Sequence, residues 1–299
     1  MNAPRGLQTV HGPLTGAFPR LERRSQLAGF ELPPEDVERF REQGYLAGLP
    51  LLDAGQVEEL RTRLGGLRER LPELRERLYE VEADWRARPE EVVLHFLGGW
   101  LVDEWLHDLV FHPGVTVPLA QLLGVSRLRF WHDQVFWKPA RHPGVVPWHQ
   151  DYSYWRRTEP ANHLTMLVTL DDMGPWNGGL EVVPGSHRWE LLPTVSFGGA
   201  IDQVLEHLPP ERRRELRPVP VEMAAGRASI HHSHLVHGSR GNPSERPRRA
   251  LVLNYMGAET RSADDSAPLL AGTPPVARGA RVEGDFFPVA LDREALPAG

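Results

Sequence analysis

Cysteine is absent from the 299 residues of the chain. This absence excludes disulfide bonds, iron–sulfur clusters, zinc sites built on thiolates and cysteine nucleophiles. Any metal ion must therefore be held by His, Asp, Glu or carbonyl oxygen atoms. A basic excess is also lacking, since the formal net charge is −6 at pH 7. We expect no nucleic-acid partner, because binding to a phosphate backbone depends on clustered positive charge.

Long apolar runs are lacking as well. The most apolar stretch, residues 92–102, is interrupted by His95 and the pair Gly98-Gly99, and it is much shorter than a membrane-spanning helix. The first residues do not combine a basic segment with an apolar core, as a secretory signal does. Hydrophobic residues make up 40% and charged residues 25%, which is typical of soluble globular proteins. These features predict a folded cytoplasmic protein without a membrane partner.

The first third of the chain indicates helices. Residues 1–32 show no periodicity and are predicted to form a tail that is loose or draped over the surface. Pro34 and Gly44 bound a short predicted helix, because proline favours the first turn of a helix and glycine favours its end. Asp53 and Gln56 form a capping-box pattern at the start of a second helix.

Apolar residues recur every three or four positions along this second helix, at Val57, Leu60, Leu64, Leu67, Leu71, Leu74 and Leu78. Such a stripe is compatible with a coiled-coil seam. We expect Gly65-Gly66 and Pro72 to interrupt it, which favours helices packed against a larger core. A third helical stretch is predicted at residues 90–123, before Gly124.

From Arg127 onward, short runs of β-branched and aromatic residues alternate with turn residues, which is typical of an antiparallel β core. A helical insert is predicted at residues 206–215. The sequence therefore predicts a mainly β fold, a double-stranded β-helix (a cupin-like jelly roll) with N-terminal buttressing helices. We expect one domain at 33–299, divided into a helical part (33–126), a β-helix core (127–256) and a C-terminal extension (257–299). The predicted strands are 128–138, 146–154, 164–170, 180–183, 218–223, 228–235 and 249–255.

The chemistry centres on His149-Gln150-Asp151. In an extended chain, side chains two positions apart point the same way, so an imidazole and a carboxylate would converge. The segment 229–239 contains four further histidines and offers a third ligand from a later strand. Two imidazoles and one carboxylate leave three coordination positions open, the arrangement of iron(II) oxygenases. An isolated His-x-Asp is more often a surface hydrogen-bonded pair, but the order of the motifs favours a metal site.

Four motifs occur in an order that resembles the phytanoyl-CoA dioxygenase family of Fe(II)/2-oxoglutarate-dependent oxygenases. They are Pro-Trp-His-Gln-Asp-Tyr-Ser-Tyr-Trp at 147–155, Asn-Gly-Gly-Leu-Glu-Val-Val-Pro-Gly-Ser-His at 177–187, His-Gly-Ser-Arg-Gly-Asn at 237–242, and Arg-Arg-Ala at 248–250. The resemblance covers roughly residues 33–256. It implies that His149, Asp151 and His237 bind iron, with His234 as the main competitor for the third position. It also makes His231, His232 and His234 candidates for supporting the metal ligands, for a structural role or for contact with the substrate.

The same resemblance implies that Arg248 binds the far carboxylate of 2-oxoglutarate. A guanidinium suits this role because it grips a carboxylate with two hydrogen bonds and stays charged when buried. Strand alternation places Arg248 on one face and Arg249 on the other; alternatively, both are solvated charges at a strand edge. Further candidates for contact with the co-substrate are Ser239, Gln134 and Lys138. Candidates for contact with the substrate are Trp148, Tyr152, Tyr154, Trp155, Arg156, Arg157 and His234. Each of these residues is as compatible with a structural role.

The activity implied by the resemblance is oxidation of an unactivated C–H bond of a small organic molecule. Dioxygen and 2-oxoglutarate would be consumed, and succinate and carbon dioxide released. Related halogenases carry a small residue where this chain has Asp151, so hydroxylation is favoured, although desaturation or ring formation would use the same ligands. The alternatives are a cupin-type metalloenzyme that does not use 2-oxoglutarate and a non-catalytic binding protein. The protein is expected to be a monomer or a homodimer.

Overall fold

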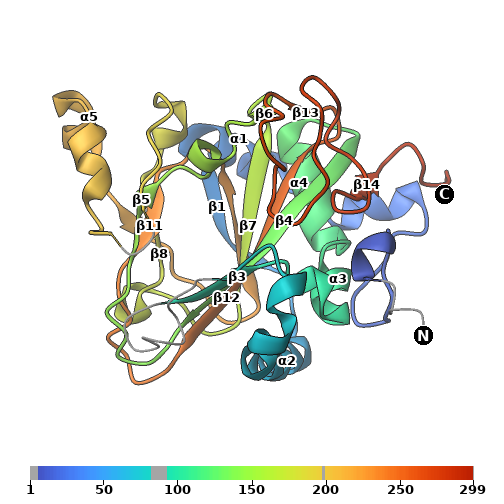
Figure 1. Cartoon of the computed structure of the whole chain (residues 1–299), viewed down its shortest axis with the longest axis horizontal. Helices are drawn as coiled ribbons and strands as arrows, with labels where there is room; N and C mark the ends of the chain where they lie inside the picture. The colour runs from blue at the N-terminus through green and yellow to red at the C-terminus, as the bar shows by residue number, and fades with distance from the viewer. Residues whose placement is uncertain (1–5, 82–92, 197–198, 299) are drawn as a thin grey trace.

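The computed structural model describes residues 6–81, 93–196 and 199–298, and two antiparallel sheets dominate it (Figure 1). The eight-stranded sheet has the order β1 (Tyr45–Pro50), β10 (Arg227–His232), β7 (His163–Thr169), β12 (Arg248–Gly257), β4 (Arg127–Lys138), β3 (Leu94–Leu97) and β2 (Glu80–Val81), and β14 (Val289–Asp292) also pairs with β4. The four-stranded sheet has the order β5 (Val146–His149), β11 (His237–Ser239), β8 (Leu180–Val182) and β9 (Val219–Pro220). This arrangement confirms the predicted double-stranded β-helix with helices added before it.

Alternation along the central strands separates two apolar layers. On β12, Leu251 and Leu253 pack into the core that is shared with the helices, whereas Ala250 and Val252 pack into a second cluster with Leu180 of the smaller sheet. Successive side chains of a strand point to opposite faces, so the inner face of the large sheet meets the small sheet. A cavity of about 350 Å³ lies between the two sheets and is lined by both.

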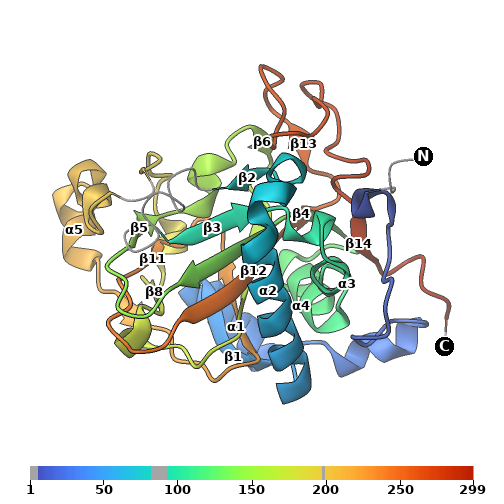
Figure 2. The same ribbon diagram turned by 60° about the horizontal axis from the view of Figure 1, so that its bottom comes forward.

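The helices cover the outer face of the large sheet (Figure 2). They are α1 (Pro34–Gln43), α2 (Ala54–Leu74), α3 (Glu104–Leu109) and α4 (Pro113–Leu123). Gly44 and Gly124 adopt left-handed conformations at the ends of α1 and α4, with φ of 80° and 67°, which is why glycine occupies both positions. None of the helices in the described part of the chain combines the length and the apolar character needed to span a bilayer.

Helix α2 runs without a break through Gly65-Gly66 and Pro72, so the predicted interruption was wrong. Its apolar stripe from Val57 to Leu74 is buried in the main core, and this burial outweighs the poor helix propensity of glycine. Pro72 lies only two residues before the end of the helix. The preference for packing over a coiled-coil seam was right. Asp53 caps the helix with the predicted capping box, its carboxylate accepting the Gln56 N–H at 2.8 Å.

The predicted helix at residues 90–123 is only partly correct. Residues 90–92 lie outside the described residues, and Leu94–Leu97 form strand β3, which pairs with residues 134–137 of β4. An apolar run of four buried residues carries no periodicity that separates strand from helix. A short 3-10 helix, η4 (Gly99–Leu101), follows the strand, and α-helix begins only at α3. The predicted insert at 206–215 is present as two short helices, η8 (Gln203–His207) and α5 (Pro210–Glu215).

Three predicted strands end several residues earlier than expected, and the one predicted at 218–223 is only the two-residue strand β9. Strand β5 stops at His149, and Asp151–Tyr154 form the short 3-10 helix η5. The predicted strand at 228–235 ends at His232 with β10, and a separate strand, β11, begins at His237 in the other sheet. His237 therefore opens a short strand rather than closing a long one. The turn between the sheets, at residues 233–236, contains no Gly, Pro, Asn or Asp, and Ser233 alone is too weak a signal to predict it.

Residues 6–32 are draped over the large sheet and its helices. They include two short 3-10 helices, η1 (Leu7–Thr9) and η2 (Arg24–Gly29), and Phe18, Leu27 and Leu32 are buried in the main core. The backbone N–H groups of Leu14 and Thr15 each donate to the Asp108 carboxylate at 2.6 Å. These contacts tie the segment to helix α3.

Buried neutral histidines predict loss of stability in acid. Burial lowers the pKa of His112, the N-cap of α4, to about 4, and its Nδ1 accepts the Gly114 N–H at 2.9 Å. The unfolded chain titrates near 6.5, so it takes up protons first as the pH falls. Stability from this residue is complete above pH 6.5 and is lost as the pH falls toward 4. As the pH falls from 7.5 to 5, we expect the contribution of His112 to the free energy of unfolding to decrease by about 2 kcal/mol.

Urea unfolding of the wild type and of His112→Asn at both pH values measures this contribution. Asparagine keeps a side-chain acceptor at the N-cap but does not titrate. We expect the variant to lose about 2 kcal/mol less than the wild type between the two pH values. An equal loss in both proteins would show that His112 does not titrate on unfolding.

Candidate metal centre and adjoining cavity

Three buried side chains converge at one end of the cavity. His149 closes β5, Asp151 opens η5 and His237 opens β11. Strands β5 and β11 pair with His237 opposite His149, so the two imidazole rings lie side by side with centroids 4.2 Å apart. Asp151 Oδ1 lies 3.4 Å from His149 Nε2 and 3.5 Å from His237 Nε2. Within the described ranges, this is the one group of three His, Asp or Glu side chains that could hold a metal ion.

Backbone carbonyls orient both imidazoles. His149 Nδ1 lies 2.8 Å from the Pro147 carbonyl, and His237 Nδ1 lies 2.9 Å from the Leu235 carbonyl. A carbonyl only accepts hydrogen bonds, so both Nδ1 atoms carry the proton and both Nε2 atoms present a lone pair. Burial holds the pKa of His237 well below its usual value, which keeps this imidazole neutral. The two rings are therefore arranged as metal ligands.

Asp151 supplies the negative charge. Burial by itself would raise the pKa of Asp151, but the surrounding imidazoles of His237, His149 and His231 hold it well below its usual value. An ionised carboxylate surrounded by imidazoles is a site for a divalent cation, because the ion supplies the positive charge that the described surroundings lack.

The opposite end of the cavity is cationic. Arg248 on β12 is buried and lines the cavity, and its Nη2 donates to the Gly178 carbonyl at 2.8 Å. Its Nε has no hydrogen-bond partner among the described residues, and no described carboxylate forms an ion pair with it. Burial lowers the pKa of Arg248 to about 10, so the side chain stays charged at neutral pH. A buried arginine without a counter-ion marks a binding site for an anion.

A buried lysine stands next to Arg248, and burial together with the Arg248 charge holds the pKa of this lysine well below its usual value. Lys138 of β4 is the cross-strand partner of Arg248 and is fully buried. Its Nζ donates to Ser239 Oγ at 2.8 Å and also to the Arg240 carbonyl. Ser239 lines the cavity, and because its oxygen accepts from Lys138, its own proton is available to an anion there.

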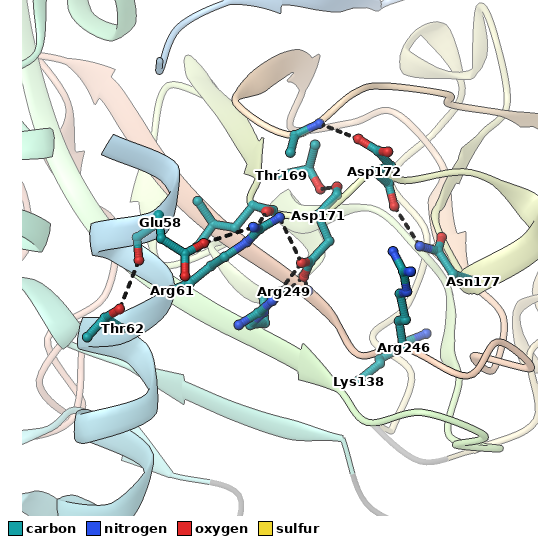
Figure 3. Close-up of polar contacts among 12 residues, drawn as sticks. Glu58, Arg61, Thr62, Lys138, Thr169, Asp171, Asp172, Asn177, Arg246 and Arg249 are labelled. Atoms are coloured by element: carbon teal, nitrogen blue, oxygen red, sulfur yellow. Dashed lines mark hydrogen bonds and ion pairs between the residues drawn. The ribbon is translucent and has the colours of Figure 1, made fainter. Parts of the chain in front are cut away.

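Arg249 faces away from the cavity, as strand alternation predicts. Figure 3 shows Arg249 next to Asp171 and to Arg61 of α2. Arg249 Nε donates to Asp171 Oδ2 at 2.9 Å, and Arg249 Nη2 donates to Asp171 Oδ1 at 2.7 Å. The two adjacent arginines thus differ in one respect: Arg249 has a described carboxylate partner, whereas Arg248 has none.

The other candidates from the sequence divide into two groups. Gln134, Tyr154 and Trp155 line the cavity, and Gln134 Oε1 lies 2.8 Å from His95 Nε2. The remaining side chains are bound elsewhere in the described structure: Trp148 to Asp202, Tyr152 to the Thr158 carbonyl, Arg156 to the Leu192 carbonyl, Arg157 to the carbonyls of Ala267 and Pro268, and His234 stacked on Tyr152. Lys138 reaches the cavity only through Ser239.

Sequence reasoning missed several cavity residues. His95 was assigned to a helix, and Thr165 carried no distinguishing signal. His231, by contrast, was among the candidates from the resemblance, and it does line the cavity; it shares strand parity with Ser229, opposite to the core residues Ala228 and Ile230. Leu269, Leu270 and Ala271 come from the C-terminal extension, and no local pattern predicts that they reach the cavity.

Arg157 fastens this part of the extension rather than touching the cavity. Its guanidinium donates to the Pro268 carbonyl at 3.0 Å and to the Ala267 carbonyl. The charged hydrogen bonds that Arg157→Ala removes together stabilise this segment by at most about 1.5 to 3 kcal/mol, because partial exposure to solvent weakens them. We expect amide hydrogen exchange in residues 263–272 to speed up roughly tenfold, with iron affinity unchanged. Arg278→Ala, an exposed site in the same extension, is the control; equal exchange in both variants would contradict this role.

This fold and this donor set together define a class: double-stranded β-helix proteins with a two-histidine, one-carboxylate centre that keeps coordination positions open. Within this class the chain belongs to the phytanoyl-CoA dioxygenase (PhyH) family, whose model matches residues 40–250.

Curated relatives and solved structures agree with this assignment. L-proline trans-4-hydroxylase of Streptomyces griseoviridis is 28% identical over 176 residues, which are 51% of this chain and 63% of that protein. Ectoine dioxygenase of Nocardia farcinica is 27% identical over 91% of this chain and 92% of its own length. The epimerase SnoN, in complex with Fe3+, alpha ketoglutarate and nogalamycin RO, superposes with a TM-score of 0.68 at 25% identity, covering 89% of this chain and 99% of SnoN. This chain covers only 51% to 63% of the length of four of the curated relatives that it matches.

Proposed function

We propose that the protein is an Fe(II)- and 2-oxoglutarate-dependent dioxygenase that hydroxylates an unactivated C–H bond of a small organic molecule and releases succinate and carbon dioxide. The observation that carries this proposal is the pairing, in one cavity, of a buried His-Asp-His cluster with a buried arginine that has no described counter-ion. A metal site alone would fit many cupin proteins. The anion site is the additional feature that a dicarboxylate co-substrate requires.

In this proposal each group of residues has one task. His149, Asp151 and His237 hold iron(II), which supplies the centre that binds the co-substrate and activates dioxygen. Arg248 binds the far carboxylate of 2-oxoglutarate through its guanidinium, and Ser239 donates its hydroxyl proton to the same group. Lys138 keeps the Ser239 oxygen occupied by donating a hydrogen bond to it. The apolar walls, which include Leu167, Leu180 and Val252, exclude water from the reacting groups.

Asp151 also bears on the type of reaction. Its carboxylate fills a ligand position that halogenation would require for a halide, so we propose hydroxylation rather than halogenation. The relatives include a hydroxylase and dioxygenases, in agreement with this choice.

The remaining walls of the cavity indicate the substrate class. They are largely aromatic and apolar, with Tyr79, Leu97, Tyr154, Trp155 and Leu270. Burial lowers the pKa values of His95 and His132 to about 4, so both rings are neutral at physiological pH. Among the described lining residues, Arg248 is the single arginine or lysine, and the proposal assigns it to the co-substrate. We therefore propose a substrate with an apolar or ring-bearing surface and without a carboxylate or phosphate group.

Succinate formation by the iron-loaded protein tests the function. A panel should contain neutral ring-bearing molecules, amino acids and acyl-CoA thioesters, with mass spectrometry to detect the gain of one oxygen atom. We expect slow succinate formation with 2-oxoglutarate alone and stimulation by the neutral compounds. Stimulation by amino acids or thioesters alone would contradict the proposed substrate class. If 2-oxoglutarate binds but no succinate forms, the non-catalytic binding protein is favoured. If 2-oxoglutarate does not bind and no succinate forms, the cupin-type metalloenzyme that does not use 2-oxoglutarate is favoured.

Two finer points complete the proposal. We place the enzyme in the cytoplasm, where 2-oxoglutarate is available as a metabolite, and we propose that it acts as a monomer or homodimer. Cell fractionation and light scattering on the purified protein test these two points.

A further inference from the structure

The two oxygens of the Asp151 carboxylate have different surroundings. Oδ1 faces the histidine ligands, at 3.4 Å from His149 Nε2 and 3.5 Å from His237 Nε2. Oδ2 points the other way, with Thr165 Oγ1 at 2.7 Å and His231 Nε2 at 3.1 Å. The carboxylate therefore offers one oxygen to the metal site and has the other surrounded by hydrogen-bond donors.

Both donors are fixed by the large sheet. His231 on β10 and Thr165 on β7 are cross-strand partners, and each is nearly inaccessible to solvent. Thr165 is in turn opposite Asn254 of β12, whose Oδ1 lies 2.9 Å from the Thr165 hydroxyl. Since β10 is paired on both sides, by β1 and β7, His231 has little freedom to move away from Asp151.

The position of His231 is difficult to explain by packing. Its neighbours on the same strand, Ala228 and Ile230, contribute to the apolar core on the opposite face. Its Nδ1 is buried and has no hydrogen-bond partner among the described residues. A buried imidazole with one unpaired nitrogen costs free energy. Its described side-chain contacts are the hydrogen bond to Asp151 and a ring contact with His237, at a centroid distance of 4.4 Å, and of the two only the hydrogen bond satisfies a polar atom.

We propose that His231, together with Thr165, is a positioning residue that keeps Asp151 a ligand through Oδ1 alone. This inference rests on the proposed function. An iron(II) ion takes six ligands; two imidazoles and one oxygen occupy three, which leaves three for the co-substrate and dioxygen. If Oδ2 also turned to the metal, two positions would remain, and 2-oxoglutarate would fill both. His231 thus preserves the position that dioxygen needs.

Nitric oxide, a probe that binds iron(II) at an open position, tests this inference without turnover. It is titrated into the anaerobic protein at saturating iron(II) and 2-oxoglutarate, and the electron paramagnetic resonance signal is recorded. In His231→Leu we expect affinity for nitric oxide to fall about 10- to 100-fold, the range typical of substitutions behind a metal ligand. Affinity for 2-oxoglutarate, which is measured separately, should stay within about threefold of the wild type, since the described side-chain contacts of His231 are with Asp151 and His237 and not with Arg248 or Ser239.

Three further variants decide between positioning and packing. His231→Gln restores a donor of similar reach and should recover most of the nitric oxide affinity. His232→Leu changes the neighbouring histidine, whose Nδ1 accepts the His234 N–H, and should have no effect. Thr165→Val removes the second donor with little change of shape and should act in the same direction, so it carries the test if His231→Leu does not fold.

Unchanged nitric oxide affinity in both His231→Leu and Thr165→Val would overturn the inference. So would equal loss in His231→Gln and His231→Leu, because this result would mean that the volume of the ring matters and its hydrogen bond does not. Failure of the wild type to bind 2-oxoglutarate is a different result: it would reject the proposed function and, with it, the inference that rests on this function.

Discussion

Alanine at His149, Asp151 or His237 should each abolish iron(II) binding at micromolar concentrations. Loss of a group that only supports a metal ligand costs about 10- to 100-fold in affinity, so loss of a ligand itself should cost more than 100-fold. All three side chains are buried around one point, and no other described group of three can replace them. Anaerobic calorimetric titration of iron(II) into the purified variants measures the effect.

His234→Ala is the matched control for this prediction. His234 lies only three residues before His237, but its ring stacks on Tyr152 with centroids 5.2 Å apart and does not line the cavity. We expect iron affinity close to that of the wild type. Retention of iron binding by His237→Ala, together with its loss in His234→Ala, would show that the third ligand has been assigned to the wrong histidine.

Local periodicity made part of the site predictable from the sequence. The spacing of His149 and Asp151 places both side chains on one side of an extended segment, even though the strand itself ends at His149. On β12, alternation separates Arg248 from Arg249, and the structure places the first in the cavity and the second in an ion pair with Asp171. Period-two alternation follows from backbone geometry alone, which is why one sequence is enough to read it.

Features that depend on distant contacts were not predictable. Strand β3 forms because β4 offers a free edge to an apolar run whose own sequence is equally compatible with helix. His231 gains its significance from Asp151, 80 positions earlier in the chain. Leu270 reaches the cavity because Arg157 fixes the preceding carbonyls, more than 100 positions away. In each case the deciding partner lies outside any window over which periodicity is meaningful.

The unpaired charge of Arg248 leads to the second large effect, on co-substrate binding. Removal of one partner from a buried, hydrogen-bonded charge pair typically costs about 3 to 5 kcal/mol, because the other charge is left desolvated. At about 1.4 kcal/mol per tenfold change, Arg248→Ala should weaken 2-oxoglutarate binding by roughly two to three orders of magnitude. Iron affinity should stay nearly unchanged, since Arg248 has no described contact with His149, Asp151 or His237.

Arg249→Ala provides the control for Arg248→Ala, because it removes an identical charge from the adjacent position. Its guanidinium is already bound to Asp171 on the other face of the sheet (Figure 3), so 2-oxoglutarate affinity should stay within about threefold of the wild type. Calorimetric titration of 2-oxoglutarate into the anaerobic, iron-loaded proteins compares the two variants directly. Normal affinity in Arg248→Ala would refute the assignment of this residue, whereas absence of binding in the wild type would refute the proposed use of 2-oxoglutarate. Severe weakening in Arg248→Ala alone would show that the cavity recognises a dicarboxylate through the buried guanidinium of Arg248, whose Nε has no described partner.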